Sequence, residues 1–152
     1  MTCKIITDRY KVKTLFLEDI PIMTSHKNLI QKYYTNFVKK CNGSVLLSGL
    51  GLGIMADMLS IKPNVTNITV IEISQEIIDT VEVKSDKVKV VCGDIYKFIQ
   101  STKDSFDCAY FDIWQDMSKE TWTEMKNLKA MCSEKIKYTE CWNEKEMNRK
   151  YQ

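Results

Sequence analysis

The feature that most constrains the fold of this chain is a regular alternation of short apolar segments with helical segments between residues 44 and 142. The apolar segments have the length and composition of strands and cover residues 44–50, 67–73, 87–92, 106–111 and 136–142. Helical patterns lie between them, over residues 54–61, after Ser74, over residues 95–101 and after Ser118. Because such alternation produces a parallel sheet with right-handed crossovers, the sequence predicts an α/β, Rossmann-like, doubly wound domain of about five strands.

The rest of the chain is too short for a second domain, since the whole sequence has 152 residues. We divide it into an N-terminal strand and helix arm (1–43), the Rossmann-like core (44–142) and a polar tail (143–152) that we expect to fray. Within the arm, residues 11–17 predict a short strand or hairpin. After Ser25, a plausible N-cap, apolar residues at the spacing of one helix face predict one helix that ends at Asn42-Gly43.

Charge and composition argue against several classes of partner. Lys and Arg number 22 against 20 Asp and Glu, so nothing draws the chain strongly to nucleic acid or to a membrane surface. No apolar run reaches the ~18–20 residues of a membrane span, and the N-terminus lacks the core of a secretory signal. We therefore expect a cytoplasmic protein with its six cysteines as thiols. With His26 as the one histidine and no cysteine cluster, no metal site is predicted.

Glycines follow the first strand of the core directly. Gly49, Gly51 and Gly53 open the following helix, at the edge of the sheet where doubly wound folds bind ligands. Ile54 stands where the dinucleotide fingerprint G-x-G-x-x-G needs its last glycine, so the run suits a nucleoside without a pyrophosphate better. The alternative is a tight strand-to-helix turn that binds nothing.

Acidic residues lie near the end of the next strand or directly after the two strands that come next. Glu72 comes 19 positions after Gly53 (72 − 53) and predicts hydrogen bonds to the two hydroxyls of a ribose; the alternative is a solvated acid at a strand end. Asp94 predicts a helix cap, an acceptor for an adenine amino group, or both. Asp112 predicts a group that orients or deprotonates a nucleophile, or else a solvated loop acid.

These features form an ordered set: VLLSGLGLG (45–53), VIEI (70–73), GDI (93–95) and YFDIWQD (110–116). As a set, they resemble class I S-adenosylmethionine (SAM) dependent methyltransferases, and within that superfamily the spermidine synthase branch. The resemblance covers about half of the chain. It implies that Gly49, Leu50, Gly51 and Gly53 lie along the methionine part of SAM.

The same resemblance implies roles at the later strand ends. Glu72 would hold the ribose hydroxyls and Ile73 would flank the adenine. Asp94 and the backbone of Ile95 would read the adenine edge, and Asp112 would face the reactive sulfonium. Beside this group lie Trp114, Gln115 and Asp116. The ring of Trp114 predicts either a cation–π contact there or a tryptophan at the edge of the core.

Departures from the family narrow the function. Leu52 stands where spermidine synthases carry an aspartate, which argues against aminopropyl transfer, and the motif N/D-P-P-Y of methyltransferases that act on bases is absent after Asp112. The leading prediction is a methyltransferase with a small-molecule acceptor and no nucleic-acid partner, which releases S-adenosylhomocysteine. The alternatives are an aminopropyltransferase, a SAM-consuming lyase that releases methylthioadenosine, and a non-catalytic nucleoside-binding subunit.

The family sheet usually continues with two more strands after the fifth. We therefore expect either the N-terminal arm to supply what is missing or another subunit to cover the edge left by residues 136–142, which favours a homo-oligomer.

Overall fold

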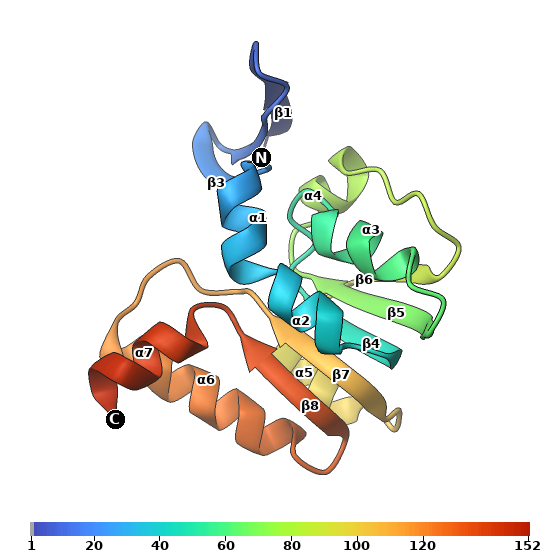
Figure 1. The fold of residues 1–152 in the computed structure, drawn as a ribbon, viewed down its shortest axis with the longest axis vertical. Helices are drawn as coiled ribbons and strands as arrows, with labels where there is room; N and C mark the ends of the chain where they lie inside the picture. The colour runs from blue at the N-terminus through green and yellow to red at the C-terminus, as the bar shows by residue number, and fades with distance from the viewer. Residues whose placement is uncertain (1) are drawn as a thin grey trace.

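Two β-sheets form within residues 2–152, the part of the chain that the computed structural model describes (Figure 1). The larger sheet contains β4 (Gly43–Ser48), β5 (Val65–Glu72), β6 (Val88–Cys92), β7 (Phe106–Phe111) and β8 (Ile136–Cys141). Its strands are all parallel and lie in the order β6-β5-β4-β7-β8. The chain thus runs outward from β4 on one side and returns to β7 on the other, which confirms the predicted doubly wound sheet.

Side chains of the larger sheet alternate between two cores, because successive residues of a strand point to opposite faces. In β4, Val45 and Leu47 pack with α2 (Thr35–Lys40), α3 (Ile54–Ser60) and α4 (Gln75–Thr80). Leu46 instead packs with α5 (Ile95–Ser101), α6 (Lys119–Cys132) and α7 (Glu144–Tyr151). Helices therefore cover both faces of the sheet, as Figure 1 shows for α2 in front and α5 behind.

The smaller sheet is an antiparallel meander of β1 (Cys3–Thr7), β2 (Lys13–Leu17) and β3 (Ile20–Thr24). The predicted strand in residues 11–17 is confirmed as β2, whose Leu15 is fully buried in the core. The turn between β2 and β3 has Glu18 and Asp19 in the left-handed region, with φ of 52° and 62°. The hairpin alternative is confirmed as well, since β2 pairs antiparallel with β3. β1 was not predicted, because all of its side chains are exposed or half-buried and leave little apolar alternation to detect.

The single helix predicted after Ser25 is wrong in detail, because the structure forms α1 (Lys27–Tyr33) and α2 with a bend at Tyr34. The N-cap of α1 is His26, whose Nδ1 accepts from the Asn28 amide at 3.3 Å, whereas Ser25 Oγ accepts from the Lys13 amide. At the bend, the Tyr34 ring is buried edge-on against Tyr110. The bend leaves α1 beside the smaller sheet and α2 on the larger one (Figure 1).

The expected fraying of residues 143–152 is also wrong. Residues Glu144–Tyr151 form α7, which packs on α6 through the fully buried Met147. Two hydrogen bonds tie the same helix down: Trp122 Nε1 donates to Asn148 Oδ1 at 2.9 Å, and the Tyr151 hydroxyl donates to the Met117 carbonyl at 2.7 Å. The polar composition of residues 143–152 gave no sign of these contacts, because their partners lie in or just before α6 and come close only in the folded chain.

Within residues 2–152, no helix is long and apolar enough to cross a membrane. β8 lies at one edge of the larger sheet, and the homo-oligomer expected to cover that edge stays a prediction.

Met147 provides a test of the docking of α7. We expect Met147→Ala to lower the free energy of unfolding by about 2–4 kcal/mol, because it removes a fully buried side chain and leaves a cavity. Met131→Ala on α6 is the matched control. Because the Met131 side chain is 37% exposed, its truncation should lower the free energy of unfolding much less. Urea unfolding of both variants measures the difference, and equal losses would show that α7 is not docked as described.

Candidate functional site

The glycine turn after β4 is held in a backbone conformation that other residues rarely adopt. Gly49, Gly51 and Gly53 have φ of 89°, 51° and 76°. A Cβ at Gly49 would lie 2.6 Å from the Asp112 carbonyl oxygen, and a Cβ at Gly51 would lie 2.4 Å from Met23 Sδ. The turn therefore brings the ends of β4 and β7 and the last part of β3 into direct contact.

Glu72 lies at the end of β5 and is 5% exposed, so the alternative of a solvated strand-end acid is wrong. Its two carboxylate oxygens have separate partners. Oε2 accepts from the Leu50 amide at 2.7 Å, and Oε1 accepts from the Ser74 amide at 2.9 Å. These bonds fix the carboxylate between the glycine turn and the start of α4, while each oxygen keeps acceptor capacity for a ligand.

Asp94 follows β6 and caps α5. Its Oδ1 accepts from the amides of Tyr96 and Lys97 at 2.8 and 3.2 Å, so the predicted capping role is confirmed. No bond to Oδ2 forms among the described residues. The apolar side chains of Ile73, which is 73% exposed, and Ile95, which is buried, lie in the same region as Asp94.

A hollow of about 460 Å³, here called the strand-end hollow, joins these residues. Nearly all of the predicted cofactor-binding residues line it: Gly49, Leu50, Gly51, Glu72, Ile73, Asp94, Ile95, Asp112 and Trp114. Gly53 does not; it is the N-cap of α3 and its amide donates to the Leu50 carbonyl. The carboxyl ends of the parallel strands thus meet at one edge of the sheet, as the fold class predicts.

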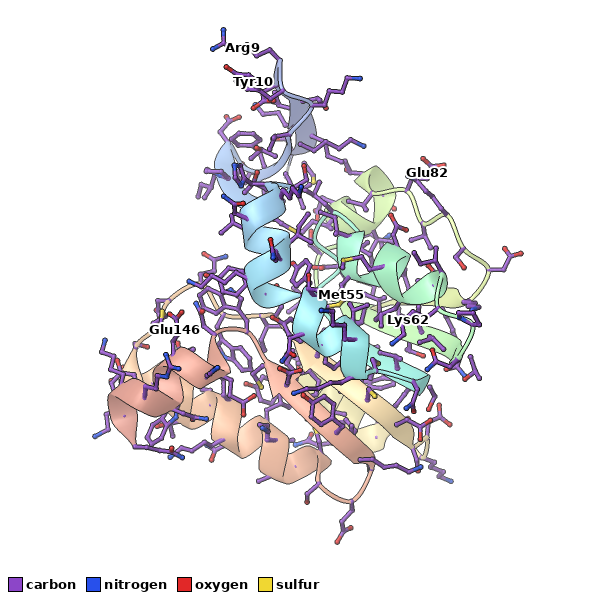
Figure 2. The ribbon with its side chains drawn as sticks, in the orientation of Figure 1. Arg9, Tyr10, Met55, Lys62, Glu82 and Glu146 are labelled. Atoms are coloured by element: carbon purple, nitrogen blue, oxygen red, sulfur yellow. The ribbon has the colours of Figure 1, made fainter. Side chains whose placement is uncertain are left out.

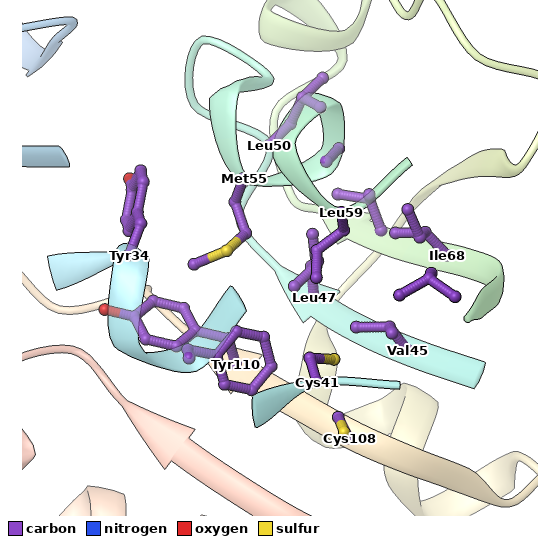
Figure 3. Packing of buried hydrophobic residues seen from close by; sticks show 14 of the residues in the cluster. Tyr34, Cys41, Val45, Leu47, Leu50, Met55, Leu59, Ile68, Cys108 and Tyr110 are labelled. Carbon is purple, nitrogen blue, oxygen red and sulfur yellow. The ribbon is translucent and has the colours of Figure 1, made fainter. Parts of the chain in front are cut away.

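Asp112 lies just beyond β7 and is partly buried. Burial raises the pKa of its carboxyl group to about 6, and a hydrogen bond from the Tyr34 hydroxyl to Oδ2, at 3.5 Å, opposes this rise. Burial and the negative charge of Asp112 together raise the pKa values of Tyr34 and Tyr110 well above their ordinary range. Figure 3 shows the two tyrosine rings close together, with Met55 extending toward them. Asp112 is therefore an acid with neutral hydroxyl groups around it.

A second hollow, here called the hairpin hollow, adjoins the first and has a volume of about 470 Å³. Its walls come from the smaller sheet, α1, the loop after β7 and Trp142. The two hollows share Ile22, Met23, Tyr34, Asp112, Trp114 and Gln115. Asp112 therefore lies where they meet.

Asp116 and Trp114, which follow Asp112 closely in the sequence, both form hydrogen bonds that stabilise the fold. The Asp116 carboxylate accepts from the Ser118 amide at 3.0 Å and from Thr121 Oγ1 at 2.6 Å, which lowers its pKa to about 2; it helps to start α6 and lines neither hollow. Trp114 is 8% exposed and belongs to the core, and its Nε1 donates to Glu124 Oε2 at 2.9 Å. The edge-of-core alternative is therefore confirmed. Trp114 also lines both hollows, and a cation contact there stays a prediction.

The sequence did not identify Tyr34 and Met23 as site residues. Tyr34 fits the apolar face of its helix, and only its hydroxyl group hinted at a polar role. Met23 Sδ accepts from the Leu52 amide at 3.2 Å and lies near the Tyr34 hydroxyl, at 3.9 Å. No local sequence pattern predicts that a methionine of β3 contacts the glycine turn. Among residues 2–152, no cluster of three or more His, Cys, Asp or Glu side chains suits a metal ion.

Replacing Asp112 by Asn removes a charge that opposes folding. The folded pKa of about 6 lies above the ordinary value of 3.8, so the folded state holds the proton more tightly, and its stability falls as the pH rises between these values and then stays level. We expect Asp112→Asn to be more stable than wild type near pH 8, by at most about 3 kcal/mol, and the gain to shrink toward pH 5. Urea unfolding at both pH values tests this. A gain that does not depend on pH would contradict the raised pKa.

No protein-family model and no curated protein sequence matches the chain. Solved structures do. A spermidine synthase from Thermotoga maritima has a TM-score of 0.68 at 15% identity, over 89% of this chain and 50% of that one. A spermidine synthase in complex with the transition state analogue AdoDATO has a TM-score of 0.65 at 14% identity, over 89% and 49%. A protein from Streptococcus mutans described as a SAM-dependent methyltransferase has a TM-score of 0.55 at 10% identity, over 90% and 39%.

The chain therefore spans about half the length of the spermidine synthases that it resembles. The strand order, the helices on both faces and these likenesses together show that it has the fold of class I SAM-dependent methyltransferases, in a form similar to that of spermidine synthases.

Proposed function

We propose that the chain binds SAM in the strand-end hollow and transfers its methyl group to a small molecule held in the hairpin hollow. The observation that carries this proposal is the place of Asp112, where the two hollows meet. A transfer reaction needs two binding sites with one reacting centre between them, and a base or orienting group at that centre.

The residues of the strand-end hollow fit a nucleoside such as SAM. Glu72 would accept from the ribose hydroxyls, since its carboxylate is already fixed by two backbone amides. Ile73 and Ile95 would enclose the adenine, with Asp94 Oδ2 at its polar edge. Ser48 also lines the hollow, and its buried Oγ is the one buried side-chain oxygen or nitrogen without a hydrogen-bond partner in residues 2–152.

The protein's contribution to the reaction would be positioning and proton transfer. SAM supplies an electrophilic methyl carbon on a sulfonium when it is bound. The carboxylate of Asp112 would hold the acceptor's reacting atom at that carbon and take its proton. A pKa of about 6 keeps Asp112 ionised at neutral pH and yet makes it a stronger base than an ordinary aspartate. Tyr34 would orient the carboxylate through its hydroxyl group.

Aminopropyl transfer is the second candidate. It is favoured by the likeness to spermidine synthases, which covers 89% of the chain and so extends beyond its core. Leu52 argues against it, because spermidine synthases carry an aspartate at this position of the glycine turn. The two reactions leave different nucleosides, so product identity distinguishes them.

The product assay tests the reaction. Incubation with SAM and an extract of small molecules should release S-adenosylhomocysteine only when the extract is present, and mass spectrometry identifies the nucleoside. We expect Asp112→Asn to lower turnover by at least about 100-fold, since the residue acts on the acceptor's proton. The affinity for S-adenosylhomocysteine should stay within a few-fold of the wild-type value. Methylthioadenosine would shift the proposal to aminopropyl transfer, or to a lyase if it forms without extract. Unchanged turnover in the variant would remove Asp112 from the mechanism.

Ile73 tests the cofactor site without risk to the fold. Because its side chain is 73% exposed, Ile73→Glu should leave the melting temperature unchanged and yet weaken binding of S-adenosylhomocysteine by about tenfold, since a charge would replace apolar contact with the adenine. Ile61→Glu is the matched control, because Ile61 is 84% exposed and lines neither hollow. Titration calorimetry measures both affinities. Equal effects of the two variants would place the adenine elsewhere.

A further inference from the structure

The hairpin hollow has one charged end. Asp112 is the single acid among the described residues that line it, and it stands at the border with the strand-end hollow. No Lys, Arg or His belongs to the described lining, so an anionic acceptor such as a carboxylate or a phosphate would have no partner there. Charge complementarity at this end therefore selects a cation.

The remainder of the hollow is apolar and aromatic. Leu29, Ile30 and Tyr33 come from α1, and Trp142 follows β8. The rings of Tyr33 and Trp142 lie 6.1 Å apart between centroids, at an angle of 44°. Thr14, Thr24 and Gln115 add only uncharged polar groups. A second ammonium group at this end would lose its hydration without gaining a carboxylate.

Three acids near Trp142 in the sequence do not change this, because each has another partner and none lines the hollow. Glu140 accepts from the Tyr138 hydroxyl at 2.7 Å. Glu144 forms an ion pair with Lys129, and Glu146 on α7, labelled in Figure 2, forms one with Lys32 at 3.2 Å. Asp112 is thus the one carboxylate that an acceptor would meet among residues 2–152.

We infer that the acceptor is a monoamine with an apolar aliphatic or aromatic body, rather than a diamine or an acid. The inference rests on the proposed function and names the substrate class of that site. The ammonium group lies against Asp112, and the body lies between α1 and Trp142. The aromatic rings of Tyr33 and Trp142 in the lining suit such an apolar body.

The transfer step balances with this acceptor. The ammonium group gives one proton to Asp112, which frees the nitrogen lone pair. That pair forms the new nitrogen–carbon bond to the methyl group while the carbon–sulfur bond breaks and its electrons stay on sulfur as a neutral thioether. The product leaves as a secondary ammonium ion, and Asp112 releases its proton to solvent.

Matched ligands test the inference by binding alone. Hexylamine, 1,6-diaminohexane and hexanoate are titrated into the full chain saturated with S-adenosylhomocysteine at about pH 7.5. We expect hexylamine to bind at least about tenfold more tightly than the diamine, because only the diamine places a second charge in the apolar end, and hexanoate to bind more weakly than hexylamine.

A variant with an added acid tests whether the preference arises in the hairpin hollow. Leu29 lies on α1 five residues before Tyr34, about 7.5 Å along the helix, and is 40% exposed, so Leu29→Glu adds an acid to the apolar end without burying it. We expect this variant to lower the ratio of hexylamine affinity to 1,6-diaminohexane affinity by at least about threefold. Ile61→Glu, with the same change away from both hollows, should leave the preference unchanged.

The outcomes separate the two proposals. If S-adenosylhomocysteine does not bind, the proposed function is wrong and the inference falls with it. If S-adenosylhomocysteine binds but the diamine or hexanoate binds as tightly as hexylamine, the inference alone is wrong. A preference that responds equally to Leu29→Glu and Ile61→Glu would also overturn it, since the selectivity would then arise outside the hairpin hollow.

Discussion

The buried carboxylate of Glu72 is the interaction on which the rest of the site depends. Its two oxygens accept from the amides of Leu50 and Ser74, so one side chain at the end of β5 ties the glycine turn to the start of α4. A polar side chain that is 5% exposed is costly to bury unless such hydrogen bonds compensate it. The same bonds that make the burial tolerable also hold the carboxyl group in one position.

A second constraint comes from the close contact between the ends of β4 and β7. Gly49 lies so near the Asp112 carbonyl oxygen that no side chain fits between them. This contact is a consequence of strand order, since β4 and β7 are neighbours in the sheet although β5 and β6 separate them in the chain. It brings Asp112 to the glycine turn, and the bend at Tyr34 then covers the carboxylate with a hydroxyl group. Burial by these neighbours is what raises the pKa of Asp112.

The N-terminal segment forms part of the walls of both hollows, although its sequence does not predict this. Met23 contacts Gly51 and Leu52 of the glycine turn and forms part of both hollows. The smaller sheet therefore provides a wall of the hairpin hollow as well as a cover for the core. Whether the N-terminal arm or a covering subunit at β8 completes the sheet edge stays a prediction.

The sequence by itself determined the larger sheet and the places of Glu72, Asp94 and Asp112. Strand periodicity and helix caps are local properties, so the bounds of β7 and α5 agree with the prediction, and each acid lies at the end of its strand or just after it, as expected. Only the tertiary structure decided the role of Tyr34, the position of Met23 and the docking of α7 through Met147. The physical reason is the same in each case: one apolar or polar contact between segments far apart in the chain overrides a weak local pattern, and such contacts leave no periodic trace in the sequence.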